Sequence, residues 1–441
     1  MRPCCAGFTL LTLATLQTVL CAQTPSPSLG EAGSAGGPLT IREAEEITLQ
    51  RNPNITVGKL RALQAHEFVR ETRAALYPTA NLSVTAVDSD PGSRISAGYL
   101  NNPVIYPRAA YGASLTQLIT DFGRTGNLVS RSQHLEKAED QNAIATQQQI
   151  ILAVDEAFYN TLETKALQVV AEQTVKARQD RVDQVQALTS AKLKSDLDLS
   201  FSNVDLARAK LLLLDTRSNY QASLATLSAI LGYTEQQNFA PVEPIEQISP
   251  PAPDVAPLVQ QALNQRPEVK ALQEEVTAAM KFSKAEHDLW WPTVNAAGAV
   301  GQAPVRDEHI SSWYGAVGVN INIPVFNGFL YNARAKSADL ETEVRRNQLQ
   351  GLQESVARDV RNTWLETQKA YERLTVTKQL EQQANQALEL AEARYRLGLG
   401  SIVEYSQAEL EKTDADLQDA DAHYRYLLSQ IELAYQLGTL R

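Results

Sequence analysis

Cysteine is scarce in this chain: among 441 residues there are three, Cys4, Cys5 and Cys21. All three fall within residues 1–22, which have the form of a secretory signal peptide, with an apolar stretch over 8–20 and a small residue, Ala22, before the expected cleavage site. A mature chain without cysteine forms no disulfide, so its fold must rest on packing. The leader also predicts export. A lipid on Cys21 is the alternative to cleavage, although Leu20 stands where a small residue normally precedes a lipidated cysteine.

Long apolar runs and basic clusters are also missing. After the leader no segment has the roughly 18 to 20 continuous apolar residues of a membrane-spanning helix, so any passage through a bilayer has to be made by strands. The 51 acidic residues outnumber the 40 basic ones, and no basic cluster interrupts this excess, which excludes nucleic acid as a partner. The histidines are far apart and no phosphate-binding loop or nucleophile motif occurs, so we expect no enzyme activity, no cofactor and no metal site.

The chain contains two copies of one unit. Shifted by 206 residues, positions 190–232 align with 396–438, and 11 of the 43 pairs are identical. Further upstream, Pro78-Thr79 matches Pro292-Thr293. The expected organisation is a signal peptide, a disordered leader, a first repeat, a Pro-rich linker and a second repeat, at residues 1–22, 23–38, 39–237, 238–257 and 258–441.

Each repeat holds two segments in which apolar and polar residues alternate, and we expect strand pairs over about 79–119 and about 293–325. The clearest strand is 313–323. Its alternation gives a lipid-facing set and a lumen-facing set, namely Val317, Val319 and Ile321 against Asn320 and Asn322. Such segments fit tilted membrane strands, and a small soluble sheet is the alternative. Four strands per chain cannot enclose water, so the membrane interpretation requires several chains.

Two segments contain no proline and can each form one helix of about 65 residues, about 100 Å long at 1.5 Å per residue. They are 124–188 and 329–397, and each turns back through a partner helix, 195–231 or 401–437. Apolar residues three and four apart predict coiled-coil seams within these antiparallel hairpins. The two seams are Ile151, Val154, Phe158 and Leu162, and Leu197, Phe201, Val204, Arg208 and Leu211.

The hairpin tips carry turn and capping residues. Gly398 permits a positive φ after the long helix, and Ser401 can cap the next helix, with Glu404 completing a capping box. In the first tip Ser195 matches Ser401, but Lys192 stands where a glycine is usual.

The segment 393–438 is similar to the second hairpin tip and returning helix of the TolC-like outer-membrane efflux proteins of Gram-negative bacteria. The joints at Pro78-Thr79 and Pro292-Thr293 and the turns at Phe122-Gly123 and Asn327-Gly328 resemble that family too, so the resemblance covers roughly residues 39–440. It implies a mainly helical fold with transmembrane strands. In a homotrimer, four strands per chain form a 12-stranded outer-membrane β-barrel, continued by a long periplasmic α-helical coiled-coil tunnel.

The function implied by the resemblance is that of a passive exit duct in a tripartite efflux or type I secretion system. Its partners are a periplasmic adaptor protein, an inner-membrane pump and outer-membrane lipid. Two other classes stay open, a periplasmic coiled-coil adaptor and a structural scaffold protein. Drug, metal and protein cargo are not distinguished, because these systems share one fold.

The resemblance also indicates residues that close the periplasmic aperture. The family's tyrosine and aspartate, which bond to each other in the closed state, fall on Tyr395 and Asp198. Its paired acidic positions fall on Glu404 and Gln407, of which only Glu404 is acidic, so a cation-attracting ring should be weaker. A basic gate residue of the family falls on Gly400, which cannot make the same bonds.

Overall fold

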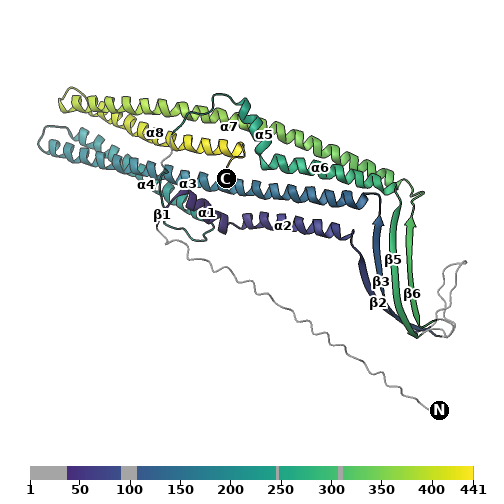
Figure 1. Cartoon of the computed structure of the whole chain (residues 1–441). Helices are drawn as coiled ribbons and strands as arrows, with labels where there is room; N and C mark the ends of the chain where they lie inside the picture. The colour runs from purple at the N-terminus through teal and green to yellow at the C-terminus, as the bar shows by residue number, and fades with distance from the viewer. Residues whose placement is uncertain (1–36, 91–106, 245–247, 306–310, 441) are drawn as a thin grey trace, which may run out of the picture.

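A computed structural model of the chain describes residues 37–90, 107–244, 248–305 and 311–440, and Figure 1 shows its long helices and its sheet. The expected signal peptide and most of the expected leader lie outside these residues. The elements, in chain order, are β1 (Pro38–Leu39), α1 (Ile41–Arg51), α2 (Pro53–Ala74), β2 (Thr79–Val87), β3 (Arg108–Thr120), α3 (Arg124–Ser190), α4 (Asp196–Ile230), β4 (Ala240–Pro241), α5 (Ala256–Gln265), α6 (Pro267–His287), η1 (Asp288–Trp290), β5 (Thr293–Val305), β6 (Trp313–Asn322), α7 (Leu330–Arg396) and α8 (Ile402–Gln436).

The predicted helical hairpins are present in both repeats. Helices α3 and α7 have 67 residues each and their partners α4 and α8 have 35 each, so a long helix spans about 100 Å. Next to the sheet, α2, α3, α6 and α7 lie side by side, while the hairpins α3–α4 and α7–α8 extend away from it (Figure 1). The hairpin tips and the sheet therefore lie at opposite ends of the molecule.

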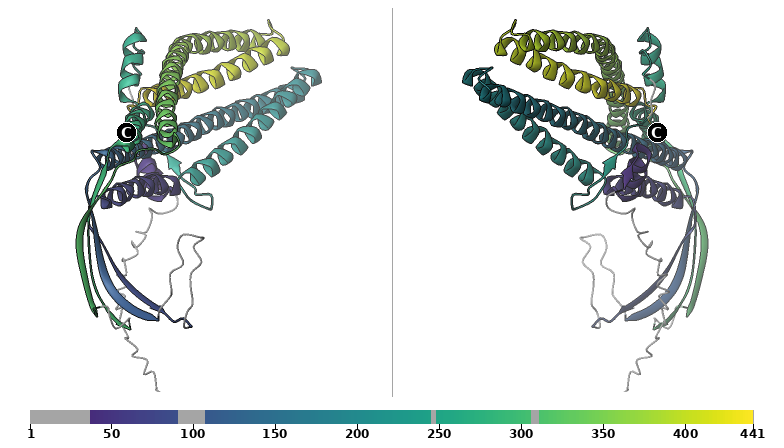
Figure 2. Two further views of the ribbon diagram at one scale, coloured as in Figure 1. Left: turned by 90° about the vertical axis from the view of Figure 1, so that its right-hand side faces the viewer. Right: turned by 90° about the vertical axis from the view of Figure 1, so that its left-hand side faces the viewer.

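The four predicted strands form one antiparallel sheet in the order β2-β3-β5-β6. Leu115, Gly298 and Val317 are successive partners across three strands, so their side chains share one face. Asn320 pairs with Asn295 and lies on the opposite face, as the alternation predicts. The strands are bowed along their length (Figure 2). Within the described residues β2 and β6 each pair on one side only, which leaves both edges of the sheet open.

Two expected boundaries were wrong. Pro38, assigned to the disordered leader, belongs to β1, which pairs in parallel with β4 inside the expected linker. The linker also ends early, because α5 begins at Ala256. The physical reason is burial: Leu39 packs into an apolar cluster with Phe158 and Leu227, and apolar burial of this kind offsets the entropy of ordering a Ser, Gly and Pro-rich segment.

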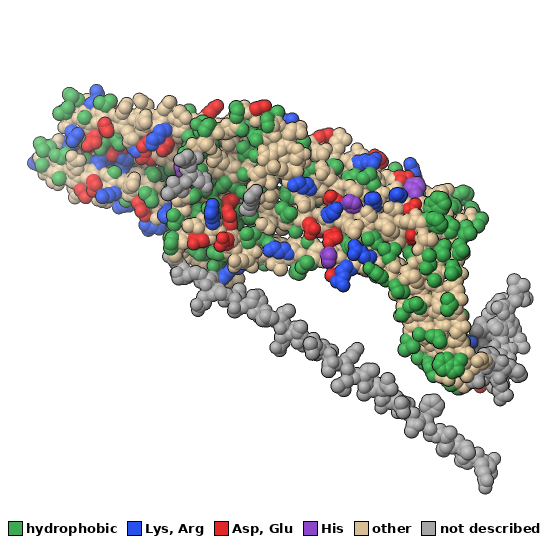
Figure 3. Space-filling model, in the orientation of Figure 1, with side chains coloured by type: hydrophobic (Ala, Val, Ile, Leu, Met, Phe, Trp, Pro, Cys, Tyr) green, Lys and Arg blue, Asp and Glu red, His purple; other side chains and the backbone are tan. Residues whose placement is uncertain are grey.

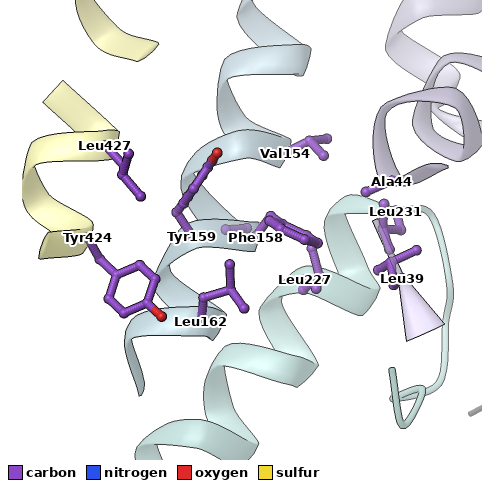
Figure 4. Close-up of a cluster of buried hydrophobic side chains, with 11 residues drawn as sticks. Leu39, Ala44, Val154, Phe158, Tyr159, Leu162, Leu227, Leu231, Tyr424 and Leu427 are labelled. Carbon is purple, nitrogen blue, oxygen red and sulfur yellow. The ribbon is translucent and has the colours of Figure 1, made fainter. Parts of the chain in front are cut away.

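The main core joins the first repeat to the end of α8. Phe158 and Tyr159 of α3 are fully buried and face Leu227 of α4 and Leu427 of α8 (Figure 4). The predicted seam of Ile151, Val154, Phe158 and Leu162 is buried throughout.

The prediction of a second seam, on α4, was wrong for a single chain, because these residues are exposed rather than packed against another helix in the described part of the chain. Leu197 and Leu211 are 63% and 62% exposed, and α4 instead buries a row of small and apolar residues that includes Ser202, Ala209 and Leu224. Small side chains allow α3 and α4 to approach closely, so the larger apolar row of α4 is left on the surface of a single chain.

Candidate functional site

The two hairpin tips share one backbone design. Lys192 and Gly398, which are equivalent in the repeat, have φ angles of 61° and 73°. In this left-handed region glycine costs nothing, whereas a lysine is strained. The next helix is capped in both tips, by Ser195 in the first and by Ser401 in the second.

The capping box predicted for the second tip forms in the first one instead. There, Ser195 Oγ accepts from the Asp198 amide and Asp198 Oδ2 accepts from the Ser195 amide, both at 3.2 Å. In the second tip Ser401 Oγ accepts from the Glu404 amide at 3.2 Å, but the Glu404 carboxylate lies 3.0 Å from Arg394 Nε. The competing ion pair therefore removes the second half of the expected box.

Gly400 makes room for this ion pair. A Cβ at this position would lie 3.1 Å from Arg394 Cβ and 3.2 Å from Glu404 Oε2. Gly400, which stands where the family has a basic residue, therefore lies against Arg394. The guanidinium group of Arg394 already forms an ion pair with Glu404.

The hydrogen bond expected between Tyr395 and Asp198 is not formed within this chain. Tyr395 is 6% exposed, and its Oη has no hydrogen-bond partner among the described residues, while Asp198 is engaged by Ser195. Burial, followed by the negative charge of Asp198, raises the pKa of Tyr395. The two groups are thus near enough to interact electrostatically but are not bonded.

Tyr395 is held by other neighbours. Lys194 Nζ lies 3.8 Å from the centre of its ring and donates to its carbonyl oxygen at 3.2 Å, and the ring of Tyr405 stacks on it at 5.6 Å. Lys194 is the repeat equivalent of Gly400. The basic side chain that the second tip lacks is therefore supplied from the first tip, which sequence reasoning did not predict.

The two remaining gate candidates are exposed at the start of α8. Glu404 lies in the first turn, and one turn later Gln407 donates to Glu411 at 2.7 Å. Both side chains are open to solvent in a single chain.

A buried charge cluster lies behind the tips where α3, α4 and α8 meet. Arg178, Arg181 and Glu409 are 7%, 4% and 4% exposed. Arg181 binds Asp205 of α4 at 2.6 Å and also contacts Glu409 of α8, and Arg178 contacts Glu409 as well. Burial lowers the pKa of both arginines, yet two carboxylates balance their two charges.

Sequence reasoning did not predict this cluster, although the spacing of its residues along the helices is a signal for it. Ala171, Arg178 and Val185 are seven residues apart and all buried, as are Ile402 and Glu409. A charged residue in register with a coiled-coil seam is unusual and indicates a buried ionic contact.

At the other end of the molecule the sheet exposes an apolar face. Val317, Val319 and Ile321 are 93%, 65% and 59% exposed, and the space-filling view shows hydrophobic side chains over the strands, with charged ones spread over the helices (Figure 3). Where strands meet helices, Trp291 and Phe329 are also exposed. An apolar band bordered by aromatic residues is the pattern of membrane strands.

The opposite face of the sheet is lined by small and polar side chains. A Cβ at Gly112 or Gly301 would lie within 2.3 Å of the Tyr314 side chain, so glycine is required where this ring lies across the sheet. Asn320 and Asn322 follow Tyr314 on the same face. Their placement agrees with the two-sided pattern, and their contact with a lumen stays a prediction.

Within the described residues no group of His, Asp or Glu side chains could hold a metal ion. The described histidines instead contact single carboxylates, such as His66 with Glu136 at 2.7 Å and His134 with Glu274 at 2.6 Å. No helix of the described part of the chain has the length and apolarity to cross a bilayer.

A sheet with one apolar and one polar face, joined to helices far longer than a membrane is thick, defines an outer-membrane channel protein. The chain belongs to the outer membrane efflux protein family, whose model matches residues 46–233 and 258–439. The match covers both repeats, and the adaptor and scaffold alternatives are therefore set aside.

Individual relatives agree with the family. The chain is 23% identical to the outer membrane protein TolC of Salmonella enteritidis over 429 residues, covering 92% of this chain and 84% of the relative. It is 22% identical over 413 residues to a probable efflux pump outer membrane protein, TtgC, of Pseudomonas putida, covering 90% and 82%. The fold matches the outer membrane protein VceC of Vibrio cholerae with a TM-score of 0.76, at 19% identity, over 90% of this chain and 96% of VceC. The protein is an outer-membrane efflux protein of the Gram-negative envelope that extends into the periplasm, as the resemblance predicted.

Proposed function

We propose that three copies of the chain assemble into a passive exit duct, with a 12-stranded barrel in the outer membrane and a helical tunnel below it. The observation that carries the proposal is the open sheet, whose edge strands β2 and β6 each lack a partner on one side among the described residues. Four strands cannot enclose water, and unpaired edges are costly in lipid, so closure with other copies satisfies both.

Exposed apolar rows on the helices support the same assembly. Helix α2 forms one edge of the helical layer and exposes Leu60 and Leu63, at 57% and 63%. Helix α7 forms the other edge and exposes Leu340 and Val344. Contact between α2 of one copy and α7 of the next would bury both rows. The same arrangement would place β2 of one copy beside β6 of the next.

The tips are the proposed periplasmic aperture and the contact with a periplasmic adaptor and an inner-membrane pump. Support comes from the family, and from the relative named as a probable efflux pump outer membrane protein. In this proposal the pump supplies the energy and the chain catalyses no reaction. Residues 1–22 are removed on export. Tyr395, Asp198, Glu404 and Gln407 surround the aperture.

Assembly is tested by native mass spectrometry of the protein purified in detergent. We expect about three times the mass of one mature chain. The full sequence, with residues 1–22 included, has a mass of 48.4 kDa. Leu60→Asp with Leu63→Asp should release monomers, because two charges would enter the proposed contact. Leu60→Met with Leu63→Met, which keeps both side chains apolar, is the matched control and should leave the trimer intact. Monomers in the wild type would overturn the proposal.

A further inference from the structure

A charged surface lies where the helices meet the sheet. The ends of α2, α3, α6 and α7 next to the strands form a basic collar, defined as residues 67–77, 121–131, 281–291 and 327–337. We infer that this collar binds the headgroups of anionic phospholipids in the leaflet that faces the periplasm. The inference rests on the proposed exit duct and names the lipid chemistry that its membrane boundary recognises.

The basic collar differs in charge from the chain as a whole. It contains eight lysine and arginine residues against five aspartate and glutamate residues, a surplus of three positive charges, whereas the whole chain has a net charge of −11. These residues come from four separate segments, so no basic run appears in the sequence. Basic side chains, with acidic ones among them, lie on the helices next to the sheet (Figure 3). In the proposed duct, three copies would bring this surplus together around the membrane boundary.

Most acidic side chains of the collar are already occupied. Glu286 is buried and lies 3.9 Å from Arg124. Asp288 accepts from Asn127 at 2.8 Å, and Asp121 accepts from a backbone amide of α3 at 2.7 Å. These carboxylates serve the local fold, and they are not free to neutralise other cations of the collar.

Three basic side chains of the collar have no such partner. Arg73 near the end of α2, Lys284 in the last turn of α6 and Arg334 in the second turn of α7 are all exposed. None of the three side chains forms an ion pair or a hydrogen bond among the described residues. The oxygen atoms of a lipid phosphate would supply the acceptors that the chain does not provide.

Exposed aromatic residues mark the strand side of the collar. Phe122 stacks on Trp291 with ring centres 5.5 Å apart, and Phe329 packs on Phe326 at 5.7 Å. All four side chains are more than half exposed. Aromatic residues in this position are typical of the boundary between hydrocarbon and headgroups. The boundary of the apolar layer is therefore expected at these rings.

The unpaired cations lie at the depth of a headgroup layer. A helix rises 1.5 Å per residue, so Arg334 lies about 7 Å along the helix from Phe329, and Lys284 lies about 10 Å from Trp291. The headgroups add about 5 to 8 Å on each side of the hydrocarbon core. Long basic side chains extend over several ångströms toward such a layer. Charge and depth together therefore fit anionic lipid.

The first test measures lipid binding to the purified trimer in detergent, by the fluorescence anisotropy of lipids labelled on an acyl chain. Phosphatidylglycerol, which is anionic, should bind the wild type more tightly than phosphatidylcholine. Arg73→Gln with Lys284→Gln and Arg334→Gln should weaken the binding of phosphatidylglycerol at least ten-fold, because each basic residue near an anionic surface strengthens binding about five-fold. The binding of phosphatidylcholine should change little.

The matched control removes three exposed cations far from the sheet or in the middle of α7, by Lys176→Gln, Lys210→Gln and Arg361→Gln. It makes the same change in net charge and should bind phosphatidylglycerol as the wild type does. Equal affinity of the wild type and the collar variant, both as intact trimers on a native gel, would overturn the inference. An equal loss of affinity in the control would also overturn it.

A charge-preserving variant guards against a folding defect. Arg73→Lys with Lys284→Arg and Arg334→Lys should keep the wild-type affinity, and a loss of affinity in this variant would mean that charge is not what binds the lipid. The wild type gives a further readout. Added salt should weaken its binding of phosphatidylglycerol several-fold, because salt screens exposed charges, and an affinity independent of salt would overturn the inference.

Free phosphate is the other source of the same chemistry. When chloride is replaced by inorganic phosphate at constant ionic strength, phosphatidylglycerol should stay bound, and its displacement would mean a site for soluble anions instead of lipid. Monomers in the wild type would overturn the exit-duct proposal. Lipid binding can be compared between monomeric variants as well, so the two failures are distinguishable.

Discussion

The sheet and the hairpin tips depart in opposite ways from the usual distribution of side chains, in which apolar groups are buried and charged groups are exposed. In the sheet, large apolar side chains are exposed, and Val317 reaches 93%. At the tips, charged side chains are buried, and Arg181 is 4% exposed. Soluble proteins normally place apolar groups inside and charges outside. The sheet therefore indicates a surface made for lipid, and the tip region indicates a junction held by ions.

The two inversions call for different substitutions. A charge added to the apolar face of the sheet should destabilise the trimer, whereas the same charge on the opposite face should not. At the tips, the important change is the loss of a charge or of its partner. The predictions below begin with the largest expected effect.

The strongest test of the sheet is a pair of neighbouring arginine substitutions. Val319→Arg should cost about 2 to 4 kcal/mol if the residue lies near the bilayer midplane, and it should lower the yield of trimer. Asn320→Arg places the same side chain on the other face and should chiefly alter conductance. Equal losses of trimer, measured on a native gel, would mean that the two faces are wrongly assigned.

At the tips, Lys194→Met removes a cation but keeps the length of the side chain. The loss of one cation–π contact and one hydrogen bond should destabilise the contact between the tips by about 1 kcal/mol. We expect a modest rise in conductance. Lys192→Met is the matched control, since Lys192 forms no ion pair or cation–π contact among the described residues. If both variants behave alike, the basic side chain supplied by the first tip has no special part in holding Tyr395.

A pH effect is expected from Glu163, a half-buried carboxylate in the middle of α3. Burial, together with the nearby Asp421, raises the pKa of Glu163 to about 7 from an ordinary value of 4.5. Between these two pH values the folded chain binds more protons at Glu163 than the unfolded chain does. The contribution of protonated Glu163 to the free energy of unfolding is therefore complete below pH 4.5 and is lost as the pH rises to about 7.

The measurement is the Tm of the trimer as a function of pH. Wild type should lose stability as the pH rises from about 4.5 to about 7, and Glu163→Gln should flatten this dependence. Glu172→Gln, an exposed position on the same helix, should keep the wild-type profile. A Glu163→Gln profile that matches the wild type would contradict the assignment.

The smallest effect is expected for Tyr395→Phe. Its hydroxyl is buried and has no hydrogen-bond partner among the residues that the structure describes, so removing it should leave stability unchanged or raise it by less than about 1 kcal/mol. Conductance should not change. A clear rise in conductance would instead indicate that Tyr395 and Asp198 bond in the assembled trimer, as the family resemblance suggests.

The sequence alone predicted the regular parts of this fold well. An absence of proline marks α3 and α7 as continuous helices, and strict alternation in 313–323 indicates β6 and its two faces. These features depend on local periodicity. Positions 38–39 and 240–241 carry no such periodicity, so the small β1–β4 pairing was missed.

The contacts of the tips depend on partners distant in the sequence. Asp205 and Ser406 are 201 residues apart, and each looks like an ordinary surface residue of a coiled coil. Glu404 was expected to complete a capping box, but Arg394 competes for its carboxylate. Which of several possible partners a polar side chain selects is decided by the packing of the hairpins, and a single sequence does not specify that packing.

The account is tested most directly by the environment of two neighbouring residues in the sheet. Single cysteines at Val319 and Asn320, in a chain whose Cys4, Cys5 and Cys21 are removed or replaced by serine, are labelled with a fluorophore in proteoliposomes. The account predicts that brominated lipid quenches the label at position 319 and leaves the label at 320 accessible to a water-soluble quencher. Equal quenching of both labels by the water-soluble reagent, with none by lipid, would contradict a membrane-embedded sheet.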